Sequence, residues 1–383
     1  MLYIFIALLI VVLFYEFYWK RRNLPPGPMP LPLIGNLHTV LACEPGYTAF
    51  EAWYKRFGPV YTYWMGKDCN LISIEMKRYT FVKDGDAYAG KFHFKAATQE
   101  YREYGVVETT GEMWRDHRRF ALHVLRDLGL SKSVMEERVS QLLYTYRDAF
   151  YAFFDRQIEA HEKAVDYGIE HSNDYVEAYL KERRRREADG DYVSFNHIQL
   201  QNMCLDLWFA GMETTSNTLS WGALYVLNHP DVQHKMRQEM DREIGSGRLI
   251  MMADKNRLPY INAVVNEVQR LANLLPMNLP HETLRDVQIG EWHLPAETGV
   301  IAQISTVMYD EKLHPSEVCY FTSSERRDEF FLLQVDELIP FSIGKRQCLG
   351  EGLARMELFL FIANLFNRFE VRFYSWFRKH TYH

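Results

Sequence analysis

The sequence contains few cysteines, and none of them forms a recognisable pair. Five cysteines occur among 383 residues, and no two stand in a C-x-x-C arrangement. Their odd number and wide spacing argue against a disulfide framework and against a structural zinc site. Scattered thiols of this kind are typical of a domain that faces the cytosol. The five residues are Cys43, Cys69, Cys204, Cys319 and Cys348.

The sequence also lacks an excess of basic charge, low-complexity tracts and visible internal repeats. Lys and Arg number 44 against 50 Asp and Glu, for a net charge of -6 at pH 7. A general nucleic-acid binder would be basic overall, so no nucleic-acid partner is expected. Hydrophobic residues make up 48% of the chain. That is enough for a sizeable core in one large domain or in two smaller ones.

A long apolar run at the N-terminus predicts a single membrane anchor over residues 1–19. As a helix of about 19 residues it would reach about 28 Å, close to the roughly 30 Å of a bilayer's hydrocarbon core. A cleaved signal peptide is the alternative, but the basic residues 20–22 follow the run instead of preceding it. This positive flank predicts that the rest of the chain stays on the cytosolic side.

A proline-rich segment over residues 20–32 follows the expected anchor. Proline at this density cannot continue a helix and holds the chain extended, so the segment is expected to be a stiff linker. An arbitrary loop, or a ligand for a proline-binding module, is the alternative. Residues 33–383 are expected to form the catalytic domain.

Hydrophobic periodicity predicts a mainly α chain with small β-sheets, an α+β protein. The basic run at 183–186 is interpreted as a solvated helix end, with a membrane-surface or partner contact as the lesser alternative. Helices are expected over residues 153–186, 199–228, 258–274 and 353–369, and strands over residues 60–64, 71–74, 287–289 and 299–304.

Cys348 differs in its surroundings from the other cysteines. It ends a glycine-punctuated loop, PFSIGKRQCLG at residues 340–350, that runs directly into an apolar helix. Glycine lets a backbone approach a bulky group closely. A cysteine just before a helix N-terminus feels the positive end of the helix dipole, which favours the thiolate. A buried structural cysteine is the ordinary alternative for a lone thiol.

The segment AGMETT at residues 210–215 is unusual for the middle of a long helix. Glycine and threonine are poor mid-helix residues, and a threonine hydroxyl that bonds back to a carbonyl can bend or open the helix. An acid beside a hydroxyl, here Glu213 beside Thr214, can relay protons. An ordinary helix kink is the alternative.

These two segments resemble the cytochrome P450 family. Residues 340–350 match F-x-x-G-x-R-x-C-x-G at all five fixed positions, and residues 210–215 match [A/G]-G-x-[D/E]-T-T throughout. The resemblance implies the cytochrome P450 fold, in its animal microsomal branch, with haem b as cofactor. It implies that Cys348 is the axial thiolate on the haem iron, which favours O–O cleavage.

The same resemblance implies roles for further residues around the haem. Phe341 would shield Cys348, and Arg346 would meet a haem propionate. Thr214 would be the alcohol of a proton relay, with Glu213 as its acidic partner.

Three weaker patterns fit the same family. Trp114 and Arg118 resemble the W-x-x-x-R pair at a haem propionate, although a basic helix surface with a packed tryptophan is the alternative. His281 stands where the family often has a residue for the other propionate, with an ordinary polar histidine as an equal alternative. Glu267 and Arg270 resemble the E-x-x-R core ion pair, a structural element, although most such pairs are surface salt bridges.

The chain departs from the family in three ways. It is shorter, and we expect the missing block, several central helices, between about residues 130 and 153. The P-E-R-F-like motif near residues 325–327 has no proline, and the chain ends soon after Val371, before the family's C-terminal sheet. Lost helices leave cavities and exposed apolar faces, which marginal stability tolerates poorly. The hypotheses are a splice form, an incomplete gene model or a degenerating copy.

The resemblance implies NADPH-dependent monooxygenation of an apolar small molecule, such as a xenobiotic, a fatty acid or a sterol. A flavin-containing reductase would bind NADPH and pass on its electrons, docking near Lys345 beside the cysteine loop. The protein would sit in the endoplasmic reticulum membrane with its catalytic domain in the cytosol. One alternative is a haem-binding or inert membrane protein without turnover. Another is a haem-thiolate isomerase, which would not need the Glu213–Thr214 relay.

Overall fold

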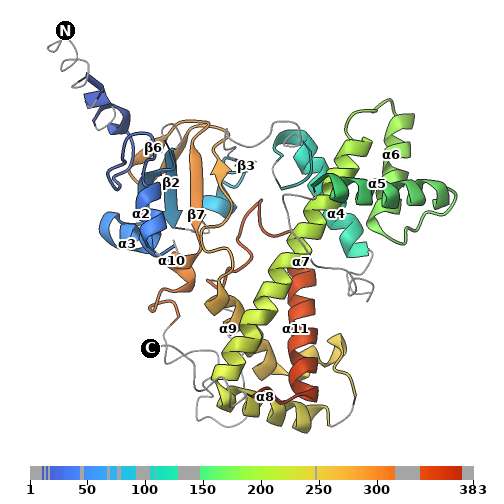
Figure 1. Ribbon diagram of the computed structural model, residues 1–383. Helices are drawn as coiled ribbons and strands as arrows, with labels where there is room; N and C mark the ends of the chain where they lie inside the picture. The colour runs from blue at the N-terminus through green and yellow to red at the C-terminus, as the bar shows by residue number, and fades with distance from the viewer. Residues whose placement is uncertain are drawn as a thin grey trace. The chain divides into compact units, whose positions relative to one another are not determined.

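Figure 1 shows the computed structural model of the chain. The chain divides into two compact units. The first unit comprises Met1–Ala97, Leu275–Pro315 and Val335–Gln347, and the second comprises Thr98–Leu274, Ser316–Gln334 and Cys348–His383. The first unit carries the sheets and the second is helical, so the predicted α+β class is confirmed. The structure describes residues 11–12, 14–15, 18–43, 47–66, 70–75, 79–91, 104–107, 109–127, 147–245, 248–314 and 337–372.

A five-stranded sheet, in the order β1-β2-β7-β4-β3, is the centre of the first unit. β2 and β7 pair in parallel, and the other pairs are antiparallel. Aromatic and β-branched residues fill β1 and β2, which fits a pleated and buried surface. The strands predicted over 60–64, 71–74 and 299–304 are confirmed. The bounds are β1 Val60–Trp64, β2 Asn70–Glu75, β3 Gly90–Lys91, β4 His281–Glu282 and β7 Gly299–Gln303.

Small elements complete the first unit. A hairpin of β5 (Val287–Ile289) and β6 (Trp292–Leu294) confirms the strand predicted at 287–289. Buried side chains of β2 and β7 share one core with Phe81 and Met308. The remaining elements are a 3-10 turn at Trp19–Arg21, α2 Leu37–Ala42, α3 Tyr47–Phe57, a π-helical turn at Tyr79–Lys83 and α10 Ser305–Met308.

The proline-rich segment lies along the edge strand β1. The Thr62 backbone N–H donates to the Pro26 carbonyl at 3.0 Å. At Gly27 an added β-carbon would lie 1.8 Å from the Thr62 carbonyl oxygen, so only glycine fits this approach. Asn36 Nδ2 donates to the Met29 carbonyl at 3.0 Å and holds the end of the segment. The extended chain thereby covers backbone groups that an open sheet edge would expose.

Most of the expected anchor over residues 1–19 lies outside the described residues. Among the residues that are described, no helix is both long enough and apolar enough to cross a membrane.

A long helix, α7 (His197–Asn228), organises the second unit (Figure 1). Asn196 caps its start, since Asn196 Oδ1 accepts from the Gln199 N–H at 2.8 Å. It ends before Pro230, as predicted. The helices packed on it are α5 Arg147–Ala164, α8 Pro230–Glu243, α9 Pro259–Ala272 and α11 Glu351–Arg368. The others are α4 Gly111–Asp127, α6 Tyr175–Ala188 and a 3-10 helix at Met252–Arg257.

The helices predicted over 258–274 and 353–369 are confirmed as α9 and α11, with ends shifted by a few residues. α9 stops at Asn273, which adopts a left-handed conformation with φ 35°. The core between α8, α9 and α11 is built from fully buried apolar side chains, among them Met236, Ile261 and Phe359.

The single helix predicted over residues 153–186 is wrong. The structure has two helices there, α5 and α6, separated by residues 165–174. Asp174 ends this connection as the N-cap of α6, since its Oδ1 accepts from the Glu177 N–H at 2.9 Å. Asp166 Oδ1 accepts from the Gly168 N–H at 2.8 Å. Such local side-chain bonds to backbone offer the chain an alternative to helix, which periodicity does not reveal.

Glu239 of α8 replaces the missing cap of α9. The α9 N-cap residue, Leu258, has no side-chain capping bond. Instead the buried Glu239 carboxylate accepts from the N–H groups of Tyr260 at 2.8 Å and Ile261 at 3.0 Å. Burial raises the pKa of Glu239, while these two donors lower it. A neighbouring helix therefore satisfies donors that the sequence of α9 leaves open.

We expect Glu239→Ala to lower the free energy of unfolding by about 2–3 kcal/mol, because two buried N–H groups lose a charged acceptor. Glu239→Gln, which retains one acceptor oxygen, is expected to cost about 1 kcal/mol. Urea unfolding followed by circular dichroism measures both. The matched control is Gln238→Ala on the exposed side of α8. Equal effects at 238 and 239 would contradict the capping role.

Candidate functional site

The loop before Cys348 belongs to the first unit and packs closely against the segment of that unit that contains Phe81 and Asp86. Gly344 has φ 86°, and an added β-carbon would lie 2.1 Å from the Phe81 carbonyl oxygen. Lys345 Nζ pairs with Asp86 Oδ1 at 2.6 Å. Glycine is therefore required at 344 both by conformation and by space. Phe341 is half-buried in this loop, and its expected shielding of Cys348 stays a prediction, since Cys348 belongs to the second unit.

Arg346 and His281 hold neighbouring carbonyl groups of the first unit. Arg346 Nε donates to the Ala89 carbonyl at 2.7 Å, and His281 Nδ1 bonds the Tyr88 carbonyl at 2.8 Å. Because a carbonyl only accepts, Nδ1 carries the proton of a neutral imidazole. Burial, with the positive charges of Lys91 and Arg346, lowers the pKa of His281 to about 3. Arg346 and His281, both expected to contact haem propionates, therefore bind adjacent carbonyl groups just before β3. The guanidinium is charged and the imidazole is neutral.

Trp114, Arg118 and Cys348 come together in the second unit. Trp114 is buried, and the Arg118 guanidinium carbon lies 5.8 Å from the centre of its ring. The two side chains stand one turn apart on α4, as their i, i+4 spacing predicts. Burial lowers the pKa of Arg118, while a charge on Cys348 acts in the opposite direction. The guanidinium is thus within electrostatic reach of the thiol.

Cys348 is exposed and lies three residues before Glu351, the first residue of α11. Desolvation by the surrounding protein raises the pKa of its thiol, and the Glu351 carboxylate adds to the rise. A hydrogen bond from the Gly350 N–H and the charge of Arg118 act to lower the pKa, but they do not prevail. The predicted bias towards thiolate is therefore wrong for the chain by itself. A metal ion bound to the sulfur would reverse this balance, since a coordinating thiol loses its proton.

The AGMETT segment lies within α7, which continues through it without a break. Thr214 Oγ1 donates to the Ala210 carbonyl at 2.6 Å, and Thr218 Oγ1 donates to the Thr214 carbonyl at 2.8 Å. The exposed Glu213 carboxylate accepts from Asn217 Nδ2 at 3.0 Å. Glu213 and Thr214 thus each bond within their own helix.

Sequence reasoning missed two sets of contacts to α7. Thr215 bonds to Glu357 of α11. Burial raises the pKa of the Glu357 carboxyl, and this bond offsets only part of the rise. Asp206 Oδ2 accepts from the N–H groups of Val106 at 2.8 Å and Val107 at 3.2 Å. Asp206 and Glu357 each stand in an otherwise apolar helical stretch. An isolated acid of this kind needs a hydrogen-bond partner, so the sequence could have indicated these contacts.

A companion contact fixes the same short segment, because the Gly105 N–H donates to Gln199 Oε1 at 2.9 Å. An added β-carbon at Gly105 would lie 2.3 Å from Asp206 Oδ2, so glycine permits the approach. Residues 105–107 are therefore held against α7 at two points.

Glu267 and Arg270 form a two-point ion pair on α9, with Nη2–Oε1 and Nε–Oε2 distances of 2.7 and 2.8 Å. The side chains are 1% and 11% exposed, so breaking the pair would leave a buried charge. Residues 325–327, which carry the P-E-R-F-like motif, lie outside the described residues.

A family model for cytochrome P450 matches residues 25–148 and 141–376. The chain belongs to the cytochrome P450 family. Cytochrome P450 2C29 of Mus musculus is 30% identical, over 97% of this chain and 93% of the relative. Cytochrome P450 2H1 of Gallus gallus is 27% identical, over 92% and 88%. Cytochrome P450 2E1 of Oryctolagus cuniculus is 28% identical, over 94% and 91%. These are animal microsomal P450s, and the family is one of haem monooxygenases.

The relatives contain residues that this P450 lacks. The alignment with the mouse relative extends over 460 positions, more than the 383 residues of the chain. The two stretches that match the family model overlap at residues 141–148. This junction lies inside the window of 130–153 in which the missing block is expected.

The side chains of this P450 fit the family's haem. Cys348 offers one exposed sulfur for iron. Arg118 in the second unit and Arg346 in the first each offer a guanidinium suited to a carboxylate such as a propionate. His281, neutral by itself, would need a proton on Nε2 to donate to a second carboxylate, and a nearby negative charge favours that proton.

We expect Gly344→Ala to lower the free energy of unfolding by about 1–3 kcal/mol or more, because a side chain is forced into a left-handed conformation against Phe81. The matched control is Gly352→Ala in α11, where an added β-carbon meets nothing within 4 Å. It is expected to raise stability by about 0.5–1 kcal/mol. Thermal unfolding by circular dichroism compares the two. A stabilised Gly344→Ala variant would contradict the packing described for the loop.

Proposed function

We propose that this P450 is a haem-thiolate monooxygenase of the endoplasmic reticulum membrane that oxygenates apolar small molecules, whether xenobiotics, fatty acids or sterols. The observation that carries the proposal is the exposed Cys348 thiol at the head of α11, with the Arg118 guanidinium within electrostatic reach. In a member of this family such a thiol is suited to be the one protein ligand of haem iron.

Haem b would be held by Cys348 at the iron and by Trp114, Arg118, Arg346 and His281 at its propionates. When bound, it supplies the site at which dioxygen is reduced and one oxygen atom is transferred. The chain's own residues would hold the haem, orient it and supply protons. The N–H of Gly350, which bonds the Cys348 sulfur, would restrain the electron density of the thiolate.

Protons would reach the site through Glu213 and Thr214. The Glu213 carboxylate is exposed to water, and Asn217 fixes one of its oxygens. Thr214 Oγ1 donates to Ala210, so its oxygen remains an acceptor, and rotation about χ1 would turn its proton away from the helix. A hydroxyl with both capacities can receive a proton on one side and pass one on at the other.

Electrons would come from a flavin-containing NADPH reductase, so NADPH is not bound by this chain. The exposed Lys345, on the loop before Cys348, supports a docking face of positive charge there, although Asp86 pairs with it. The apolar run at residues 1–19 supports a membrane anchor, and its positive flank a cytosolic catalytic domain.

An inert or merely haem-binding protein is the alternative, and two observations motivate it. The relatives carry residues that have no counterpart here. Large apolar side chains on α7 and α11 are also exposed: Trp221 by 44%, Leu224 by 41%, Phe361 by 43% and Leu365 by 39%. Uncovered apolar faces of this kind are what a missing helix would leave.

The reduced, carbon-monoxide difference spectrum of the full chain tests haem-thiolate binding. We expect a Soret band at the position of thiolate-ligated haem, lost in Cys348→Ala, because the sulfur ligand is then absent. Cys43→Ala, which removes another free thiol, is expected to retain the band. A wild-type chain without this band would favour the inert alternative.

The proton relay is tested by Thr214→Ala against Thr218→Ala, which removes an equivalent back-bonded hydroxyl one turn further along α7. With an NADPH reductase added, Thr214→Ala is expected to keep the carbon-monoxide spectrum. It should raise the hydrogen peroxide released per NADPH oxidised about tenfold, because a positioned proton donor is lost. Unchanged peroxide release in Thr214→Ala, or the same rise in both variants, would contradict the relay.

A further inference from the structure

Helix α4 presents different groups on different sides. Trp114 and Arg118 stand one turn apart and share one side. Asp116, two residues after Trp114, points to the opposite side, because each residue turns the helix by about 100°. His117 lies between the two sides. The orientation of Trp114 and Arg118 therefore depends on what holds the other sides of the helix, which carry Asp116, His117 and also Phe120, whose ring packs against Phe195.

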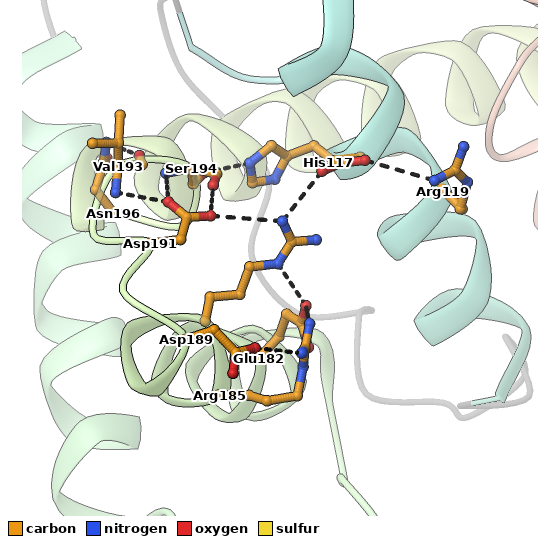
Figure 2. Close-up of polar contacts among 11 residues, drawn as sticks. His117, Arg119, Glu182, Arg185, Asp189, Asp191, Val193, Ser194 and Asn196 are labelled. Atoms are coloured by element: carbon orange, nitrogen blue, oxygen red, sulfur yellow. Dashed lines mark hydrogen bonds and ion pairs between the residues drawn. The ribbon is translucent and has the colours of Figure 1, made fainter.

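His117 is fixed by contacts to the turn before α7. Its side chain is fully buried, and its Nε2 bonds the Ser194 carbonyl at 2.6 Å (Figure 2). The ring stacks on Phe195 at 4.3 Å between centres and on Tyr179 of α6 at 5.8 Å. This contact sets one side of α4 against α6 and the turn.

Arg186 of α6 holds the side of α4 that carries Asp116. Its Nη1 lies 3.2 Å from Asp116 Oδ2 and 3.7 Å from Asp191 Oδ2, and its Nε lies 2.8 Å from Glu182 Oε1. The guanidinium carbon lies 4.7 Å from the centre of the Phe195 ring. Burial lowers the pKa of Arg186, but Glu182 and Asp116 raise it by a larger amount, so the net shift is upward. Arg186 thus belongs to a partly buried ion cluster, while Arg184 and Arg185 of the same basic run are exposed, as expected of a solvated helix end.

The turn between α6 and α7 is itself rigidly bonded. Asp191 Oδ1 accepts from the N–H groups of Val193 at 3.1 Å and Ser194 at 3.0 Å, and Asp191 Oδ2 accepts from Ser194 Oγ (Figure 2). These bonds hold the pKa of Asp191 at about 2. Asn196, the N-cap of α7, donates to the Val193 carbonyl at 3.0 Å. The cluster therefore links α4, α6 and the start of α7.

We propose that Arg186 is a positioning residue for the haem: by holding Asp116 it fixes the rotation of α4, so that Trp114 and Arg118 face the propionate and Cys348. The inference rests on the proposed function. Without the guanidinium, the one ion pair of Asp116 left within the described part of the chain is that with Arg119 of its own helix, at 3.6 Å, which cannot orient α4 against its neighbours. Among the described residues, His117 and Phe120, whose ring packs edge-on against Phe195 at 5.2 Å, would then be the tethers that remain on these sides of the helix.

Arg185 provides a matched control. It stands beside Arg186 on α6 and makes comparable ion pairs, to Glu182 at 2.7 Å and Asp189 at 3.1 Å. These partners lie on α6 or at its C-terminal end, and the Arg185 side chain is 60% exposed. Arg185→Gln and Arg186→Gln therefore remove the same charge from neighbouring positions, and only the second change reaches α4.

The first measurement is hydrogen–deuterium exchange of the full chain. Faster exchange over residues 111–127 is expected in Arg186→Gln and Asp116→Asn, and wild-type exchange there in Arg185→Gln. The second is the rate at which haem passes to excess apomyoglobin. We expect it to rise about tenfold or more in Arg186→Gln, as for other partners that orient a ligand, and less than about twofold in Arg185→Gln. Arg186→Lys, which keeps the charge, should restore part of the difference.

Two outcomes would overturn the positioning role: unchanged exchange over residues 111–127 in Arg186→Gln, or equal haem loss in the Arg185 and Arg186 variants. Asp116→Asn keeps the test decisive if Arg186→Gln fails to fold. A wild-type chain that takes up no haem would contradict the proposed function. The exchange comparison would still decide whether Arg186 holds α4.

Discussion

The packing of α7 against α9 and α11 is the interaction on which the second unit depends. The helices meet at Gly222, where an added β-carbon would lie 3.2 Å from Val268 Cγ1 and 3.6 Å from Ile362 Cδ1. This close approach sets Thr214 of α7 in a fixed relation to α11, the helix that follows Cys348. The hydrogen bond between Thr215 and Glu357 adds a polar link to the same contact. Packing and polar bonding thus connect α7, which carries the proposed proton relay, to α11, the helix that follows the thiol.

Cys348 in the second unit and His281 in the first are each held in the uncharged form by the protein around them. By itself the chain raises the pKa of the Cys348 thiol, because desolvation of the thiolate outweighs the Gly350 N–H and the Arg118 charge. It likewise keeps His281 neutral, because burial and neighbouring cations disfavour the imidazolium. Iron at the sulfur would favour the thiolate, and a carboxylate near the imidazole would raise the pKa of His281.

The chain is shorter than its relatives but keeps the motif residues expected at the haem. The local contacts of the site are present, including the Glu267–Arg270 pair and the tethers of residues 105–107 to α7. The apolar side chains exposed on α7 and α11 show where the fold has less cover than an apolar helix face ordinarily has. Because stability is a small difference between large terms, uncovered surface of this kind acts on folding before it acts on chemistry.

The sequence by itself determined the residues of the motifs and most of the elements. Periodic apolar residues, a cap at Asn196 and a stop at Pro230 are local signals, so α7 could be predicted nearly to its ends. The tertiary structure decided what depends on distant neighbours. The division of residues 153–186 into two helices, the direction of the Cys348 pKa and the reach of Arg186 to Asp116, 70 positions away, belong to this second group. Desolvation and long-range pairing follow from what the fold packs around a group, which spacing along the chain does not encode.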